Sequence, residues 1–352
     1  MLLYDYNTEL VNKMKLHLFF LTLAIFFSST PVWAKDNSLR YPVGRRSVVC
    51  GTDTSNKLLA YKDEIGSWQG FDADICRNFA LAILGDAEAF TLRNVSNKDL
   101  VKALDEGQID IMLGNHVISA KQEVTNPVVS TDVLYIDKQI FAERHKSDAT
   151  SMQQYKKANV CVVANSHDFE NLYDYNQKYA MEFNILQYTS PADAKQAFYL
   201  GRCQLISGSE IYIKSIAENL VSKENDIRIL PEIISYRPVY AYTAKMNPEF
   251  QVAVKWILNA PKLAEQQGIT SKNIDSFIGI RSGSVKNLLG ADQSLWKQMD
   301  LKPDWVIKAI KQRGNFGEIY ERNFGKYSEY KIERDKNNLI ENGGIINALP
   351  FI

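Results

Sequence analysis

The fold is decided by the stretch QIDIMLGNHVISAKQ, residues 108–122. It opens with a short apolar run, IDIML (109–113), which is typical of a buried parallel strand and is closed by Gly114. The pattern Ser-x-x-Gln at residues 119–122 then predicts a capping box that opens a helix turn. A helix that follows a strand directly leaves free backbone N–H groups facing a crevice, which suits a carboxylate or another anion. We therefore expect a ligand-binding corner here.

An extended segment follows this corner. Residues 128–141 are expected to be extended, and AER (142–144) turns polar, as a chain does when it leaves one globular part for another. A binding corner followed directly by a domain crossing indicates a ligand site close to the junction of two parts of the protein.

Length and charge narrow the class of protein. A chain of 352 residues is expected to form roughly two domains. Apolar residues make up 45% and charged residues 23%, which are ordinary values for a soluble globular protein. Lys plus Arg (41) equals Asp plus Glu (41), so no basic field is present to recruit nucleic acid. We expect no cofactor and a monomer.

The N-terminus resembles a secretory signal peptide that starts at Met14. Lysines flank this methionine, residues 16–27 form an apolar core, and Val32 and Ala34 are the small residues of a cleavage site. Residues 1–34 are thus predicted to be removed, and the mature protein is predicted to be periplasmic. An uncleaved membrane anchor is the alternative, which the short apolar core disfavours.

The four cysteines, Cys50, Cys76, Cys161 and Cys203, all lie in the predicted mature chain. The compartment permits disulfides, and four cysteines allow three connectivities. Their spacing and the internal repeat described below favour Cys50–Cys76 and Cys161–Cys203. A zinc site is the weaker interpretation, because there is no Cys-x-x-Cys pair.

The first strand is predicted at SVVCG (47–51), and a loop follows its carboxyl end. Open α/β sheets bind ligands beyond the carboxyl ends of their strands. Asp53, Leu59 and Tyr61 lie on this loop and are therefore candidate ligand-binding residues.

A helix–glycine–strand unit occurs twice, 94 residues apart. The first copy contains Asp99, Ala103, Leu104, Gly107, Gln108 and Ile111, and the second contains Asp193, Ala197, Phe198, Gly201, Arg202 and Leu205. Val49-Cys50 and Val160-Cys161 repeat in the same sense, 111 residues apart. Chance similarity is the alternative, but two related α/β lobes explain the pattern better.

Residues 230–242 are expected to be the second crossing. Pro231 and Pro238 argue against a central strand in this segment. Two crossings predict a two-lobed, hinged α/β protein with its cleft between the lobes. Residues 35–141 plus 235–352 are assigned to lobe 1 and residues 142–234 to lobe 2.

Six motifs then carry a resemblance to a known family. They are WQGFDADICR (68–77), LGD (84–86), GRC (201–203), LPEIIS (230–235), GITSKN (268–273) and GNFGEIYERN (314–323). In these six motifs and in their order along the chain, the protein resembles the periplasmic substrate-binding proteins of bacterial amino-acid ABC transporters (extracellular solute-binding proteins, family 3). It is most similar to their general L-amino-acid-binding branch, over about residues 45–350.

The resemblance implies a function and partners. Such proteins are two-lobed, close on an amino acid and deliver it to an inner-membrane permease and ATPase, so the chain is expected not to be an enzyme. The four cysteines fall where this branch has its bridges.

The ligand clamp, meaning the residues that bind the ligand's charged groups, departs from the family at the corner. The family pattern Thr-x-Thr-x-x-Arg holds the ligand carboxylate with a guanidinium. Here the corner is VISAKQ (117–122), so one hydroxyl remains at Ser119 and Gln122 takes the arginine position. Gln122 is alternatively only the capping-box partner of Ser119, and a one-residue shift would bring Lys121 into the arginine position.

The second lobe departs as well. NSH (165–167) replaces a Gly-Thr-Thr loop, and the carboxylate that receives the ligand's ammonium falls on Ser209, next to Glu210. A charged hydrogen bond contributes about 1.5–3 kcal/mol, so losing both anchors would cost orders of magnitude in affinity. We therefore expect an altered clamp and an atypical ligand. The candidate ligand-binding residues are Asp53, Leu59, Tyr61, Asn115, His116, Val117, Ser119, Gln122, Ser166, His167 and Ser209.

Two histidines, His116 and His167, fall on loops predicted to line the cleft, one from each lobe. With Asp168 and Glu210 they suggest a metal site or a pH-sensitive latch. The plainer interpretation, two polar loop residues, is favoured because no tight ligand spacing exists.

Two other functions compete with solute binding for import. One is a ligand-free or small-molecule-sensing envelope adaptor. The other is a dehydratase-like enzyme on the same fold, which no Ser/His/Asp or paired-acid arrangement requires.

Overall fold

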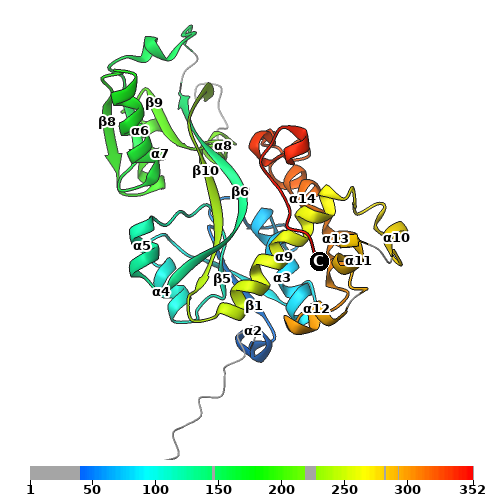
Figure 1. The fold of residues 1–352 in the computed structure, drawn as a ribbon. Coiled ribbons are helices and arrows are strands. Elements are labelled where there is room, and N and C mark those ends of the chain that lie inside the picture. The colour runs from blue at the N-terminus through cyan, green and yellow to red at the C-terminus, as the bar shows by residue number, and fades with distance from the viewer. Residues whose placement is uncertain (1–39, 145–146, 219–226, 281–282, 292, 352) are drawn as a thin grey trace, which may run out of the picture. The chain divides into compact units, whose positions relative to one another are not determined.

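The computed structural model describes residues 40–144, 147–218, 227–280, 283–291 and 293–351. In this part of the chain eight strands form one sheet, in the order β4-β1-β5-β10-β6-β9-β7-β8, and β2 and β3 form a separate hairpin (Figure 1). The strands are β1 (Val48–Thr52), β2 (Tyr61–Lys62), β3 (Trp68–Gln69), β4 (Phe90–Asn94), β5 (Ile111–Met112), β6 (Val128–Glu143), β7 (Asn159–Val163), β8 (Asn184–Tyr188), β9 (Leu205–Ser209) and β10 (Arg228–Ala244).

The sheet contains two parallel groups. β1 pairs in parallel with β4 and β5, and β7 pairs in parallel with β8 and β9. The long strands β6 and β10 run antiparallel to each other and join the groups, because β10 also pairs with β5 and β6 also pairs with β9. The predicted two-lobed α/β fold class is confirmed. The hinge and the lobe boundaries at residues 142 and 234 stay predictions.

The expectation that residues 230–242 contain no central strand is wrong, because β10 lies between β5 and β6. Pro231 lies where the register of β10 against β6 shifts. The regular inter-strand hydrogen bonds are already interrupted there, so the backbone N–H that proline lacks is not missed. Pro238 pairs with Ile136, whereas β10 pairs with β5 only at Tyr242. Over the proline-containing length β10 therefore has one strand neighbour, and the prolines are tolerated as they are at a sheet edge.

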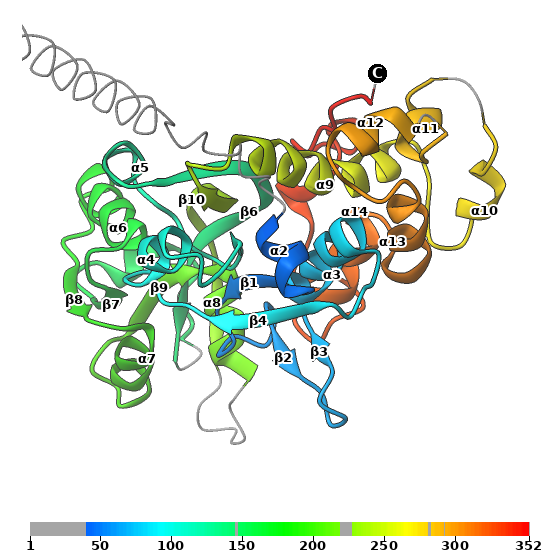
Figure 2. The same cartoon turned by 90° about the horizontal axis from the view of Figure 1, so that it is seen from below.

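Helices pack on both parallel groups. α3 (Phe71–Leu84) packs on β1 and β4 and in turn contacts α9 and α13 (Figure 2). The other helices are α2 (Arg40–Arg45), α4 (Leu100–Asp105), α5 (Ala120–Thr125), α6 (His167–Lys178), α7 (Pro191–Tyr199), α8 (Glu210–Glu218), α9 (Pro248–Gln266), α10 (Ile274–Phe277), α11 (Gly283–Leu288), α12 (Gln293–Gln298), α13 (Trp305–Arg313) and α14 (Phe316–Asn323), and the short 3₁₀ turns are η1 (Met152–Tyr155), η3 (Asp335–Asn337) and η4 (Ile340–Asn342).

Helix ends test the capping predictions. The capping box of α5 is confirmed, since the Gln122 N–H donates to Ser119 Oγ (3.2 Å) and the Ser119 N–H donates to Gln122 Oε1 (2.8 Å). The side chain of Ser96 does not cap α4, the helix before β5. Its hydroxyl donates to Asp99 Oδ2 (2.6 Å) within a preceding turn, so α4 begins only at Leu100.

The internal repeat has the same hydrogen bonds in both copies. The Gln108 N–H donates to Ala103 O (2.9 Å), as the Arg202 N–H donates to Ala197 O (3.0 Å). The strands also correspond, because the N–H groups of residues 110 and 204 donate to the carbonyls of residues 49 and 159. The structural offset between β1 and β7 is thus 110 residues, one fewer than the sequence comparison indicates.

The core is divided among several clusters. The largest surrounds α3, α9 and the C-terminal helices and includes Trp296 and Trp305. Two smaller clusters are formed by side chains from the segment 140–234. Val160 belongs to one of them, and its neighbour Cys161 belongs to the other. The two clusters therefore lie on opposite faces of β7.

Both predicted disulfides are present, Cys50–Cys76 and Cys161–Cys203. The first links β1 to α3, and the second links β7 to Cys203, two residues before β9. None of the described helices is both long and apolar enough to cross a membrane. The predicted signal peptide, residues 1–34, lies outside the described residues.

Replacing Cys161 and Cys203 together by serine should lower the free energy of unfolding by about 2–5 kcal/mol, since this bridge closes the longer loop, 42 residues against 26 for Cys50–Cys76. Chemical denaturation measures the difference. If the stabilisation comes from the lower entropy of the cross-linked unfolded chain, the double serine variant at Cys50 and Cys76 should lose slightly less stability. Equal stability of the variant and the oxidised wild type would contradict this expectation.

Candidate functional site

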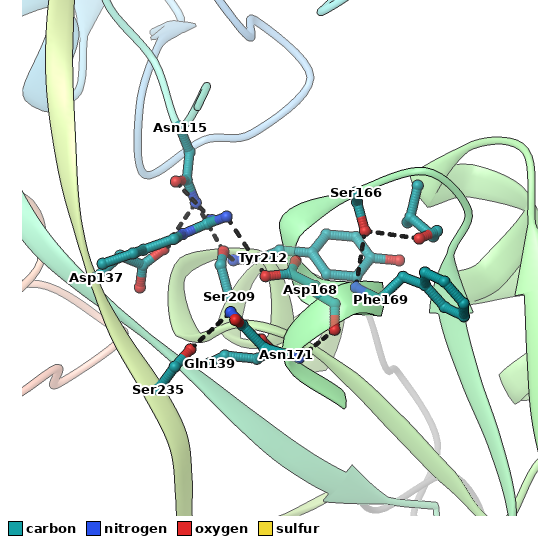
Figure 3. Close-up of polar contacts among 12 residues, drawn as sticks. Asn115, Asp137, Gln139, Ser166, Asp168, Phe169, Asn171, Ser209, Tyr212 and Ser235 are labelled. Atoms are coloured by element: carbon teal, nitrogen blue, oxygen red, sulfur yellow. Dashed lines mark hydrogen bonds and ion pairs between the residues drawn. The ribbon is translucent and has the colours of Figure 1, made fainter. Parts of the chain in front are cut away.

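The carboxyl ends of β5 and β9 meet at the side chain of Asn115. Its Nδ2 donates to Ser209 Oγ (2.7 Å) and to Asp137 Oδ2 (2.8 Å), as Figure 3 shows. Gly114, which precedes Asn115 in the chain, has a positive φ of 83°. A Cβ added to Gly114 would lie 3.1 Å from the His116 ring. The structure thus brings together two predicted site residues, one from each parallel group.

Arg237 on β10 is the centre of this network and was not among the predicted residues. It lies opposite Asp137 of β6 in the strand register. Its Nη2 donates to Asn115 Oδ1 (2.8 Å) and lies 3.4 Å from Asp137 Oδ2, and its Nη1 lies 3.4 Å from Asp168 Oδ1. The side chain is 14% exposed, and among the described residues its Nε has no hydrogen-bond partner.

Burial and charge oppose each other in this cluster. Burial raises the pKa of Asp168, and the nearby Arg237 guanidinium offsets part of that increase. Burial acts to lower the pKa of Arg237, but Asp168 and Asp137 outweigh it, so the pKa of Arg237 rises above its ordinary value. Arg237 therefore stays a cation, held between two carboxylates.

One signal in the sequence pointed to Arg237. Each crossing segment carries an ionisable residue in its middle, Asp137 in the first and Arg237 in the second. Antiparallel strands place such residues opposite each other, where opposite charges attract. The residues that the family pattern indicates lie on loops at strand ends, and that pattern does not include this pair.

A cavity of ≈ 320 Å³ borders Arg237. Its walls carry the ionisable side chains of Glu123, His167 and Arg237, and its other lining residues are Val117, Ile118, Ser130, Asn171, Ser235, Tyr236, Pro238, Tyr240 and Tyr242. Hydrogen bonds from the hydroxyl and N–H of Ser130, at 2.7 and 2.8 Å, lower the pKa of Glu123, which is therefore a carboxylate at neutral pH. The cavity thus has an anionic and a cationic group among aromatic and apolar walls.

Two of the predicted site residues, Val117 and His167, line this cavity. The others lie elsewhere. Leu59 is enclosed in the large core, and Tyr61 is 38% exposed on the separate hairpin. Asp53 Oδ1 accepts the Ser55 N–H (2.9 Å) within its own loop.

The hydroxyl-bearing candidates are used as helix caps. Ser119 and Gln122 form the capping box of α5, as the plainer sequence interpretation proposed. Ser166 caps α6, accepting the Phe169 N–H (3.1 Å) and donating to Val163 O (2.6 Å). Ser209 accepts the Tyr212 N–H (3.1 Å) in addition to Asn115.

His116 lies in the interior rather than on an open loop. Burial lowers its pKa to about 4, so it is neutral above about pH 5 and no pH latch between pH 5 and 8 follows from it. Its Nδ1 contacts Asn97 Oδ1. In the described ranges no group of three or more His, Cys, Asp and Glu side chains is arranged to hold a metal ion.

Residues 48–326 match the model of a protein family, the bacterial extracellular solute-binding proteins, family 3. The chain belongs to this family. It is 30% identical over 304 residues to the putative amino-acid ABC transporter-binding protein YhdW of Escherichia coli (strain K12), a match that covers 86% of this chain and 89% of that protein.

A second relative is the general L-amino acid-binding periplasmic protein AapJ of Rhizobium johnstonii, 30% identical over 305 residues and covering 86% of this chain and 89% of that protein. A solved structure, an ABC transporter periplasmic binding protein from Brucella ovis with glutathione bound, has a TM-score of 0.83 and 30% identity, and covers 90% of this chain and 99% of that chain. The predicted family is confirmed, and so is the predicted role as the solute-binding component of an amino-acid-type ABC importer.

A buried carboxyl lies directly behind the corner. Asp72, in the first turn of α3, accepts from Thr52 Oγ1 (2.5 Å), while its Oδ1 has no partner in the described part of the chain. Burial raises its pKa to about 7, against hydrogen bonds from Thr52 and the Gly114 backbone. The folded state therefore holds a proton here that an unfolded carboxyl would release near pH 4.

Asp72→Asn should flatten the pH dependence of stability. Because the pKa of Asp72 is raised in the folded state, its stabilising contribution to the free energy of unfolding is complete below about pH 4. That contribution is lost as the pH rises through 7. Between pH 4 and 8 the free energy of unfolding of the variant should therefore rise relative to that of the wild type by up to about 4 kcal/mol, at about 1.4 kcal/mol per pH unit. Denaturation at a series of pH values tests this, with the exposed Asp105→Asn as control. Parallel stability profiles of Asp72→Asn and wild type would contradict it.

Proposed function

We propose that this binding protein takes an amino-acid-derived anion larger than a common free amino acid, and that it binds the ligand with an altered clamp centred on Arg237. The proposal is carried by Arg237, a cation that lines a ≈ 320 Å³ cavity and whose buried Nε has no partner among the described residues. An unsatisfied buried donor costs about 1–3 kcal/mol, and a ligand oxygen would remove that cost.

The predicted anchors support an altered clamp because Gln122 Oε1 and Ser209 Oγ already have partners within the protein. Gln122 Oε1 accepts the Ser119 N–H, and Ser209 Oγ accepts from Asn115 and from the Tyr212 N–H. Neither side chain carries a charge, so neither supplies the ionic contact that the family pattern provides. Arg237 is the guanidinium that the corner lacks, contributed by β10.

The ligand carboxylate is proposed to approach Arg237 from the cavity side. The backbone N–H groups at the start of the twelve-residue helix α6 add a partial positive charge, since its first residue, His167, also lines the cavity; Asp168 and Glu170 in the same turn oppose it. Asp137 and Asp168 hold the guanidinium in place from behind. An ammonium group of the ligand would find its counter-charge at Glu123 rather than at Ser209.

Cavity size and walls support a ligand larger than one residue. Pockets for small molecules commonly measure about 300–1,000 Å³ and are mostly apolar with a few polar groups. Tyr236, Tyr240 and Tyr242 supply such walls here. The similar Brucella ovis protein has glutathione bound, so glutathione is the first probe to use.

The remaining assignments belong to the same proposal. We assign residues 142–234 to one lobe and residues 35–141 plus 235–352 to the other, with β6 and β10 as the hinge. The protein is proposed to be exported with cleavage after Ala34, to act as a monomer without enzymatic activity, and to deliver its ligand to an inner-membrane permease.

Calorimetry with glutathione and with common L-amino acids tests the clamp. Wild type should bind glutathione, and Arg237→Lys should weaken that binding at least tenfold, because lysine keeps the charge but loses the Nε–H and the planar donor set. Arg93→Lys, an exposed arginine changed in the same way, is the matched control. Micromolar or tighter binding of a common amino acid by wild type would contradict the altered clamp.

The converse variant restores the family anchors. Gln122→Arg with Ser209→Asp should raise affinity for at least one common L-amino acid, since each charged contact contributes about 1.5–3 kcal/mol before losses to misplaced neighbours. Val117 and His167 limit the gain. Absence of any ligand in a thermal-shift screen of amino acids, peptides and organic anions would favour the adaptor function instead.

A further inference from the structure

The C-terminal segment contacts both long strands at one place. We call the 3₁₀ turn Asp335–Asn337 the C-terminal clasp. It lies beyond residues 48–326, the part of the chain that the family model matches. On β6 it contacts Ile136, and on β10 it contacts Tyr236. These contacts lie on either side of the register pair Arg237 and Asp137.

The contact with β6 resembles strand pairing. The Ile136 N–H donates to Asn337 Oδ1 (2.7 Å), and Asn337 Nδ2 donates to Ile136 O (2.8 Å). The pairing of β9 with β6 runs from residue 139 to residue 143, so at Ile136 this edge of β6 lies beyond the end of β9. One buried side-chain amide thus satisfies both backbone groups of Ile136, as a further strand would.

The contact with β10 is made by the other end of the clasp. The Tyr236 hydroxyl donates to Asp335 Oδ2 (2.7 Å), and Lys336 Nζ lies 5.6 Å from the centre of the Tyr236 ring. Because Tyr236 immediately precedes Arg237 and also lines the cavity, a contact that fixes Tyr236 constrains the strand that carries the guanidinium.

The clasp is anchored to the larger core through Arg334. Arg334 Nη2 donates to Glu265 Oε2 of α9 (3.1 Å) and to Asn337 O (2.7 Å). Its guanidinium also lies 5.7 Å from the ring centres of Phe316 and Tyr320 on α14. The clasp therefore has a fixed base, and it holds the two strands from that base.

We infer that the C-terminal clasp is a positioning device, in which Asn337 and Asp335 hold β6 and β10 at the Arg237–Asp137 pair and limit how far the two lobes open. The inference rests on the proposed function for its hinge and clamp, and it adds the regulation of the same site. A protein that loses the clasp keeps its sheet and both disulfides but gains freedom at the crossing strands.

Asn337→Ala tests the clasp in the ligand-free full-length mature protein. Amide exchange in residues 132–140 and 234–240 should rise at least tenfold, whereas exchange in β1 and β7 should not change. The radius of gyration from X-ray scattering should increase as the open state gains population. Asn342→Ala, an exposed asparagine in the next 3₁₀ turn, is the matched control and should leave both measurements unchanged.

A second variant, Tyr236→Phe, removes only the hydroxyl that donates to Asp335 and should show the same local effect in smaller size, even if Asn337→Ala fails to fold. A uniform rise of exchange over the whole chain, or scattering equal to that of Asn342→Ala, would overturn the inference. Neither measurement uses a ligand, so failure of glutathione binding would refute the proposed function and leave this result standing.

Discussion

The pairing of Arg237 with Asp137 across two antiparallel strands is the interaction on which the rest of the site depends. A guanidinium that is 14% exposed is stable in the interior only if its charge and its donors are matched. Asp137 matches it from the opposite strand, Asp168 from α6 and Asn115 from the end of β5. Because these partners come from both parallel groups, the same cation that faces the cavity also links the two halves of the sheet.

Much of the fold was predictable because local rules and tertiary structure agree. The SxxQ pattern at residues 119–122 predicted the capping box that α5 has. The repeated helix–glycine–strand unit is built with the same backbone hydrogen bonds in both copies. Where the backbone's own requirements set the structure, the residue pattern was sufficient.

The errors arose where tertiary context overrules a local preference. Pro231 and Pro238 argue against a central strand, yet β10 accommodates them at a register shift and over a length with one strand neighbour. Leu59 was a candidate for the ligand and lies in the core instead. The importance of Arg237 depends on partners up to 122 residues away in sequence. Its sequence signal, a charged residue in the middle of each crossing segment, is therefore informative only once the two segments are known to pair.

The one-residue difference between the two repeat offsets has a consequence for the history of the chain. In the aligned copies Cys161 corresponds to Gly51, and Cys203 corresponds to Ile109. A Cβ built on Gly51 would lie 2.6 Å from Cδ1 of Ile109, so the first copy has a close contact where the second has a covalent bond. In the aligned copies Cys50 corresponds to Val160, so Cys50 and Cys161 point to opposite faces of their parallel groups and are joined to different elements. The two bridges are therefore not copies of one ancestral disulfide, and at least one of them was acquired by its own half separately.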